Sequence, residues 1–212
     1  MLAKHRESEG AGSHALIISD GWLKLGEAWV ALARDDLPAG RRIATENLRA
    51  LGAVRARGEL QRWKTLEEYF FYSVENRAEQ LSGNFAAAEH SGQQAVEARK
   101  AAGASAMDDR RLLNVELTWL ALAQARQGHT SDAAQTIAPV VKFQRELAAR
   151  NRGDRWQPQE LAAALYAQAL AEPPHRAALL REAAVLMDGL VPEVRATHDV
   201  KRWRAWVLEA QR

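Results

Sequence analysis

Turn-forming residues recur at one fixed interval along this chain, and that interval restricts the chain to a repeated architecture. Pro38, Gly83, Gly128 and Pro173 lie 45 residues apart, three times in succession. Twelve and thirteen residues after each of them stands an apolar pair: Ala50 and Leu51, Ala95 and Val96, Val140 and Val141, Val185 and Leu186. Self-similarity at a period of about 20–50 residues is typical of stacked repeat proteins, so the register predicts four copies of one structural unit.

The repeated unit is predicted to be a pair of helices. Between the turns, apolar residues recur at steps of three and four, as in the series Ile18, Trp22, Leu25, Trp29 and Leu32. We find no sustained alternation with a period of two residues, which is the pattern of a half-buried strand. The sequence therefore predicts an all-α fold, a right-handed α-solenoid of about four antiparallel helical hairpins plus a terminal helix.

The same register predicts the organisation of the chain. We expect a single helical-repeat domain over residues 1–212, with residues 1–12 flexible and residues 192–212 forming a terminal capping helix. Asn84 and Thr130 each follow a turn glycine, which predicts that they are helix N-caps. Pro139 falls inside the helical run 131–150, where it must kink or split the helix.

Composition excludes several kinds of protein. No run approaches 18 uninterrupted apolar residues, so we expect no membrane span. The absence of cysteine excludes disulfide scaffolds, thiolate zinc sites and cysteine nucleophiles. The formal net charge is only +2, and residues 1–12 are charged without an apolar core, unlike a secretion signal. We therefore expect a cytoplasmic protein.

The sequence contains no pattern that indicates catalysis or metal binding. Its six histidines are scattered, and none forms a His-x-x-x-His pair. Gly10 and Gly12 are not followed by Lys-Ser or Lys-Thr, so they do not form a phosphate-binding loop. We expect a protein that is not an enzyme and that binds neither a cofactor nor a metal.

The third copy of the unit resembles a known family. A helix carrying Leu117, Leu120 and Ala121 leads into a turn at Gly128, and Ala133 follows five residues later. A second, weaker match of the same kind consists of Gly83, Ala88 and Ala95. This pattern resembles the tetratricopeptide repeat, in which small residues let paired helices approach closely and stacked pairs bury a continuous core.

The chain also departs from this family. Its repeat has about 45 residues instead of the family's 34, and Pro173 replaces the turn glycine in the last copy. Asn76 and Glu79 occupy places where the family prefers a small residue and an aromatic one. The resemblance is therefore to a divergent relative with long helices.

The resemblance implies a set of partner-binding residues. In the tetratricopeptide family, the first helix of each hairpin lines a concave groove. Carried over by register, the groove-lining residues in two successive copies are Tyr72, Asn76, Arg77, Gln80, Asn114, Thr118 and Gln124.

The terminal helix contributes two further candidate binding residues, Trp203 and Trp206. Three residues separate them by most of a turn, so we expect that they do not both face inward easily. In one interpretation, one of them seals the end of the solenoid. In the other, the pair forms a surface for self-association or for a partner, since tryptophan is enriched at interface hot spots.

These observations predict a non-catalytic protein–protein interaction module, a scaffold or regulator that holds a peptide or partner protein in its groove. An alternative is a ligand- or peptide-sensing regulatory domain of a bacterial signalling or transcription-control protein, since chains with this resemblance are often appended to such proteins. Nucleic-acid binding through the arginine-rich segments 41–64 and 150–155 is less favoured, because basic and acidic residues are nearly balanced.

Overall fold

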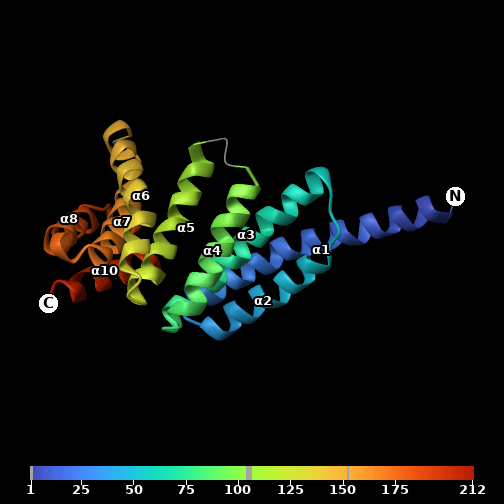
Figure 1. Cartoon of the computed structure of the whole chain (residues 1–212), viewed down its shortest axis with the longest axis horizontal. Coiled ribbons are helices and arrows are strands. Elements are labelled where there is room, and N and C mark those ends of the chain that lie inside the picture. The colour runs from blue at the N-terminus through green and yellow to red at the C-terminus, as the bar shows by residue number, and fades with distance from the viewer. Residues whose placement is uncertain (1, 104–106, 152) are drawn as a thin grey trace. The chain divides into compact units, whose positions relative to one another are not determined.

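The structure is a computed structural model that describes residues 2–103, 107–151 and 153–212. No side chain is described for residues 2–13, 15 and 107–109. Residues 2–12 form the beginning of helix α1, Met1 lies outside the described residues, and the predicted flexibility of residues 1–12 stays a prediction. All regular structure in the described ranges is helical, which confirms the all-α prediction (Figure 1).

The described residues form ten α-helices and one short 3-10 turn. In chain order they are α1 (Leu2–Ala33), α2 (Leu37–Ala53), α3 (Gly58–Leu81), α4 (Phe85–Ala101), α5 (Met107–Arg126), α6 (Thr130–Arg150), α7 (Gln157–Ala171), η1 (Pro173–His175), α8 (Arg176–Asp188), α9 (Pro192–Arg195) and α10 (His198–Ala210). Over these ranges, no helix combines the length and apolar character that crossing a membrane requires.

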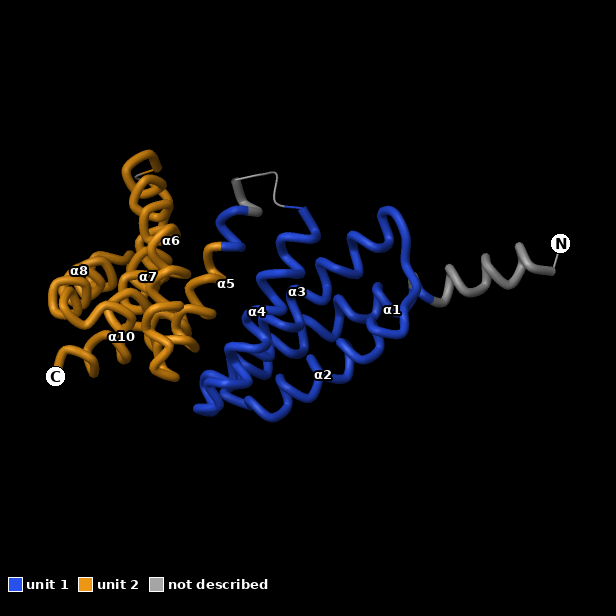
Figure 2. Tube along the Cα trace, in the orientation of Figure 1, with its two compact units in different colours: residues 1–113 blue, residues 114–212 orange. Residues whose placement is uncertain are grey.

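The chain divides into two compact units, and the boundary falls inside α5 (Figure 2). The first unit spans Met1–Leu113 and the second spans Asn114–Arg212. Each unit is described separately below. The single domain over 1–212 and the solenoid arrangement both stay predictions.

In the first unit, α1 and α2 pack together, and α3 packs against both of them and against α4. One face of α1 is buried in this core through Ile18, Leu25, Ala28 and Leu32, whose steps of three, four and seven keep them on one side of the helix. The core is completed by apolar residues of α2 and α3, among them Phe71, which is fully buried.

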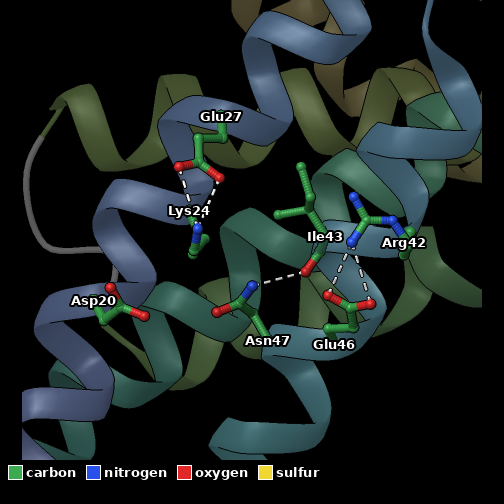
Figure 3. A pocket seen from close by; sticks show the side chains of 7 residues that line it. All are labelled: Asp20, Lys24, Glu27, Arg42, Ile43, Glu46 and Asn47. Carbon is green, nitrogen blue, oxygen red and sulfur yellow. Dashed lines mark hydrogen bonds and ion pairs between the residues drawn. The ribbon is translucent and has the colours of Figure 1, made fainter.

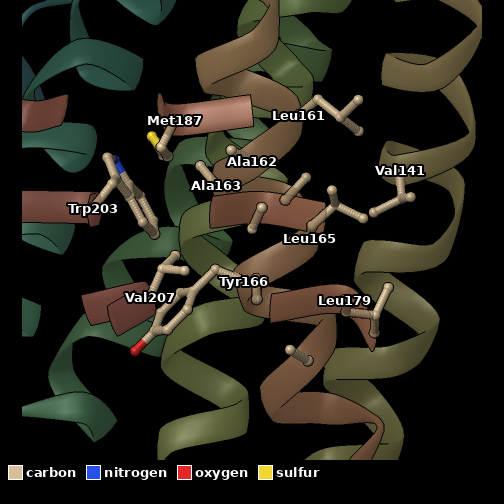
Figure 4. Packing of buried hydrophobic residues seen from close by; sticks show 14 of the residues in the cluster. Val141, Leu161, Ala162, Ala163, Leu165, Tyr166, Leu179, Met187, Trp203 and Val207 are labelled. Atoms are coloured by element: carbon tan, nitrogen blue, oxygen red, sulfur yellow. The ribbon is translucent and has the colours of Figure 1, made fainter. Parts of the chain in front are cut away.

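In the second unit, α7 lies at the centre and contacts α6, α8 and α10. Ten of its residues are buried: Gln157, Leu161, Ala162, Ala163, Ala164, Leu165, Tyr166, Ala167, Ala169 and Ala171. A helix that is apolar nearly all round must have neighbours on every side, and Figure 4 shows buried side chains of the other helices gathered around α7.

Three of the helix pairs are closed by the same backbone turn. Asp35, Gly83 and Gly128 have φ angles of 58°, 81° and 85°, in the left-handed region. The residue after each of them donates its backbone N–H to the carbonyl five residues earlier, at 2.9 Å, 2.8 Å and 2.9 Å. This is the Schellman arrangement that ends a helix and reverses the chain.

The shared turn corrects the predicted register of the first repeat. Asp35, rather than Pro38, takes the left-handed position in the first turn. The left-handed residues of the first and second turns are therefore 48 residues apart, whereas those of the second and third turns are 45 apart. Five residues after each turn stand Gly40, Ala88 and Ala133, all buried. A Cβ at Gly40 would lie 3.0 Å from Leu32 Cδ2, so a larger residue at this position of the first helix pair would require Leu32 to shift.

The helix-cap predictions have mixed outcomes. Asn84 is the N-cap of α4, as predicted. The prediction for Thr130 is wrong, because His129 is the N-cap of α6. Helix α6 continues through Pro139, so the alternative of a split helix is also wrong.

The fourth turn, at Pro173, differs from the others because η1 is inserted before α8.

We expect Gly83→Ala to lower the free energy of unfolding by about 1–2 kcal/mol, because a Cβ is strained at a φ of 81°. Gly52→Ala is the matched control. Gly52 is helical and exposed with open space around it, so alanine there should stabilise by about 0.5–1 kcal/mol. Urea denaturation measures both changes. Equal effects of the two substitutions would contradict the role given to the left-handed turn.

Candidate functional site

Two of the predicted groove residues in the first unit are buried between helices. Asn76 is fully buried, and its Nδ2 donates a hydrogen bond of 2.7 Å to the carbonyl oxygen of Ala88. Gln80 is 2% exposed, and its Nε2 donates to Asn76 Oδ1 at 3.0 Å. These amides connect α3 to α4, so a partner on the surface would not reach them directly.

The other two residues of this set are half-buried and reach the surface. Arg77 donates to the carbonyl oxygen of Ser73 at 3.0 Å, and its guanidinium lies 4.9 Å from the centre of the Trp29 ring. Burial raises the pKa of Tyr72, and the nearby carboxylates of Glu68 and Glu75 raise it further. The structure thus divides the predicted set into an inner and an outer pair.

A polar network that the sequence analysis did not identify joins α2 to α3 beside this set. Arg41 Nε lies 2.7 Å from Glu79 Oε1, and Asn84 Nδ2 donates to Glu79 Oε2 at 2.8 Å. Thr45 Oγ1 donates to Glu75 Oε1 at 2.6 Å. The signal available in the sequence was Glu79 itself, an acid at a position where the resembling family has an aromatic residue.

In the second unit, the predicted residues of α5 are also largely enclosed. Thr118 and Gln124 are buried at 5% and 6% exposure, and Asn114 is half-buried. Thr118 Oγ1 donates to the carbonyl oxygen of Asn114 at 2.9 Å, one turn earlier in the same helix. Their use by a partner stays a prediction.

Trp203 and Trp206 belong to one aromatic cluster with Trp119 and Tyr166. The ring centres of Trp203 and Trp206 lie 4.9 Å and 6.2 Å from that of Trp119, and 5.9 Å and 6.1 Å from that of Tyr166. The expectation that the two residues do not both face inward is wrong, because residues three apart lie on the same face of a helix. Trp203 is buried, and the half-buried Trp206 is covered by the guanidinium of Arg126 at 4.3 Å.

A shallow polar depression of about 310 Å³ lies between α1 and α2 (Figure 3). Its cations are matched by nearby acids. Lys24 Nζ lies 3.0 Å from Glu27 Oε2, and Arg42 Nη1 lies 3.2 Å from Glu46 Oε2. After these two ion pairs, the carboxylate of Asp20 is the one lining charge without an ion pair in the depression. In the part of the chain that the structure describes, no cluster of three or more acids and histidines could hold a metal ion.

Glu67 is the most unusual titratable residue in the first unit. It is fully buried, and neither carboxyl oxygen has a hydrogen-bond partner. The carboxyl group occupies the space where Gly21 of α1 has no side chain, and an added Cβ there would clash with Glu67 Oε1. Burial raises the pKa of Glu67 to about 8, with smaller contributions from the acids Glu68 and Asp20.

The outward face of α1 carries a line of exposed apolar side chains. Leu16 and Leu23 are each 71% exposed, and Val30 is 49% exposed. They are seven residues apart, so they lie almost on one line of the helix, opposite the buried face that contains Leu25 and Ala28. We call these three residues the α1 stripe.

The comparisons with known proteins add no relative. No protein-family model, no curated protein and no solved structure matches this chain. The assignment of function therefore depends on the residues and contacts described above.

We expect the stability of the protein to fall as the pH rises from about 5 to about 8. A carboxyl group in the unfolded chain ionises near pH 4.5, whereas folded Glu67 keeps its proton until about pH 8. The folded state binds more protons in this window, so the free energy of unfolding should decrease by roughly 3–5 kcal/mol across it. Chemical denaturation at several pH values measures the slope.

Glu67→Gln keeps a neutral group of the same shape and should remove this slope. Glu59→Gln, which changes an exposed acid in the first turn of the same helix, should leave the slope unchanged. A slope that survives in Glu67→Gln would show that another group causes it.

We expect Asn76→Ala to lower the free energy of unfolding by about 1–3 kcal/mol, because the buried amide of Gln80 loses its acceptor and the bond to Ala88 is lost. Gln93→Ala serves as the control, since the bond of Gln93 to Glu89 is exposed, and its effect should stay within about 0.5 kcal/mol. Thermal unfolding of both variants tests the expectation. If Asn76→Ala does not change the free energy of unfolding, the Asn76 side chain is available for a role other than packing.

Proposed function

We propose that this chain is a non-catalytic interaction module, built of helical hairpins related to the tetratricopeptide repeat, that binds a segment of a partner protein. The α1 stripe is the observation that carries the proposal. An exposed leucine by itself is ordinary, but three aligned apolar residues on one helix face are typical of a contact surface.

The spacing within the α1 stripe favours a helical partner. Apolar side chains seven residues apart on a straight helix occupy one of the two positions of the seam into which a second helix inserts its own apolar side chains. Between Leu16, Leu23 and Val30 stand Ser19 and Gly26, both exposed and small. A Cβ added at Gly26 would meet nothing within 4 Å, so a partner helix has room to approach the backbone there.

Ion pairs engage three of the seven basic residues in segment 41–64, which weakens the case for nucleic-acid binding there. Arg41 is paired with Glu79 at 2.7 Å, Arg42 with Glu46 at 3.2 Å, and Lys64 with Glu68 at 3.5 Å. Cations that are already neutralised release few counterions on binding a phosphate backbone. Protein binding therefore remains the function that the described contacts favour.

A photo-crosslinking amino acid in place of Leu23, introduced into the full chain in its native cells, tests this function. We expect one discrete cross-linked partner. The same crosslinker in place of Val185, which is 73% exposed on α8 in the second unit, should not capture that partner.

Charged substitutions at the two ends of the α1 stripe make the test specific. Leu16→Glu together with Val30→Glu should reduce capture at position 23 at least tenfold, because the desolvated apolar contact is lost. Capture that is unchanged by these substitutions, or equal at both crosslinker positions, would contradict the proposal. A captured second copy of the same chain would replace it with self-association.

A further inference from the structure

A second depression, in the other unit, differs in charge from the one between α1 and α2. It has a volume of about 560 Å³ and lies where the start of α8 meets the end of α10. It is lined by Pro173, Pro174, Arg176, Ala177, Leu180, Arg181, Ala210 and Gln211. We call it the α8–α10 groove. Its lining combines an apolar floor with two arginines, and it includes no acidic residue.

The walls of the α8–α10 groove are held together by hydrogen bonds between its two helices. Gln211 Nε2 donates to the carbonyl oxygen of Leu180 at 3.1 Å. Arg176 Nη2 donates to the carbonyl oxygen of Ala210 at 3.3 Å. These contacts join residues that are more than 30 positions apart in the chain, so the groove is a built feature of the second unit.

The acids closest in sequence to the two arginines are engaged elsewhere. Glu172 accepts a hydrogen bond of 3.0 Å from Gln168 and lies 3.1 Å from His175 Nδ1. Glu182, the neighbour of Arg181, is paired with Arg145 at 2.7 Å. Among the described residues, neither Arg176 nor Arg181 forms an ion pair, and both are exposed. The groove therefore presents two cations to an outside anion, unlike the depression of Figure 3, in which both cations are paired with acids.

We propose that the α8–α10 groove binds an acidic peptide segment of a partner protein, with a carboxylate against Arg176 and Arg181 and an apolar side chain against the exposed apolar lining residues Pro173, Pro174 and Ala177. Guanidinium groups recognise carboxylates through paired, charge-assisted hydrogen bonds. The apolar floor distinguishes such a peptide from a bare anion. This inference rests on the proposed interaction function and assigns it a second contact and a partner chemistry.

Titration of the isotope-labelled full chain with short synthetic peptides tests the proposal by NMR. The probe is a capped hexapeptide of alternating glutamate and leucine. Two matched probes replace all glutamates by glutamine or all leucines by serine. We expect the first probe to shift the backbone amide signals of Ala177, Leu180 and Gln211, and both matched probes to bind at least tenfold more weakly, because each lacks one of the two contacts.

Substitution of Arg176 and Arg181 provides a second test of the proposal. Arg176→Gln together with Arg181→Gln should weaken binding of the first probe by about tenfold or more. The control removes two exposed charges of the same unit outside the groove, Lys142→Gln together with Arg155→Gln, and should change binding less than threefold. Amide shifts away from the groove, equal binding of the serine probe, or full binding by the arginine variant would each overturn the proposal. Displacement of the probe by a short oligonucleotide at lower concentration would assign the groove to nucleic acid instead.

The two proposals fail in different ways. Loss of peptide binding in the groove with intact capture at position 23 would remove only the groove. Peptide binding without any capture at position 23 would remove the α1 stripe and leave the groove as the partner site.

Discussion

The close crossing of paired helices is the constraint on which the fold depends. Each of three turns uses a residue with positive φ, and each places a small buried residue five positions later, at Gly40, Ala88 and Ala133. The left-handed residue reverses the chain within two or three residues, and the small side chain allows the second helix to lie close to the first. The remaining contacts of each unit follow from this geometry, because the crossing determines which faces of the helices are buried.

The helices could be predicted from sequence because apolar spacing and turn glycines are local signals. The predicted register of the first repeat is wrong because Asp35 takes the left-handed conformation that glycine takes in the other two turns. A search for Gly and Pro does not detect such an aspartate. The candidate site was less accessible to such reasoning. Asn76 and Gln80 are polar and are therefore predicted to lie on a surface, yet both are buried, and the amide nitrogen of each donates a hydrogen bond inside the protein. Hydrogen-bond partners that distant parts of the chain supply cannot be seen in a helical pattern.

The two candidate surfaces differ in chemistry, and this difference supports separate roles for them. In the first unit, Lys24, Arg41, Arg42 and Lys64 are paired with acids, and the buried carboxyl of Glu67 is uncharged near neutral pH. Its most exposed apolar feature is the outer face of α1. In the second unit, two arginines border an apolar groove without a carboxylate of their own. A partner that carries both an apolar helix and an acidic segment matches these properties.

The enclosure of α7 has a consequence for how the second unit loses its structure. Since ten of its residues are buried, removal of any neighbouring helix exposes a large apolar area on α7. Detachment of α6, α8 or α10 alone is therefore costly, and the five helices α6 to α10 should melt as one cooperative block. In the first unit, α1 packs mainly against α2 and α3. Fraying can begin there, on the same helix that offers its outer side to a partner, and occupation of that side would suppress it.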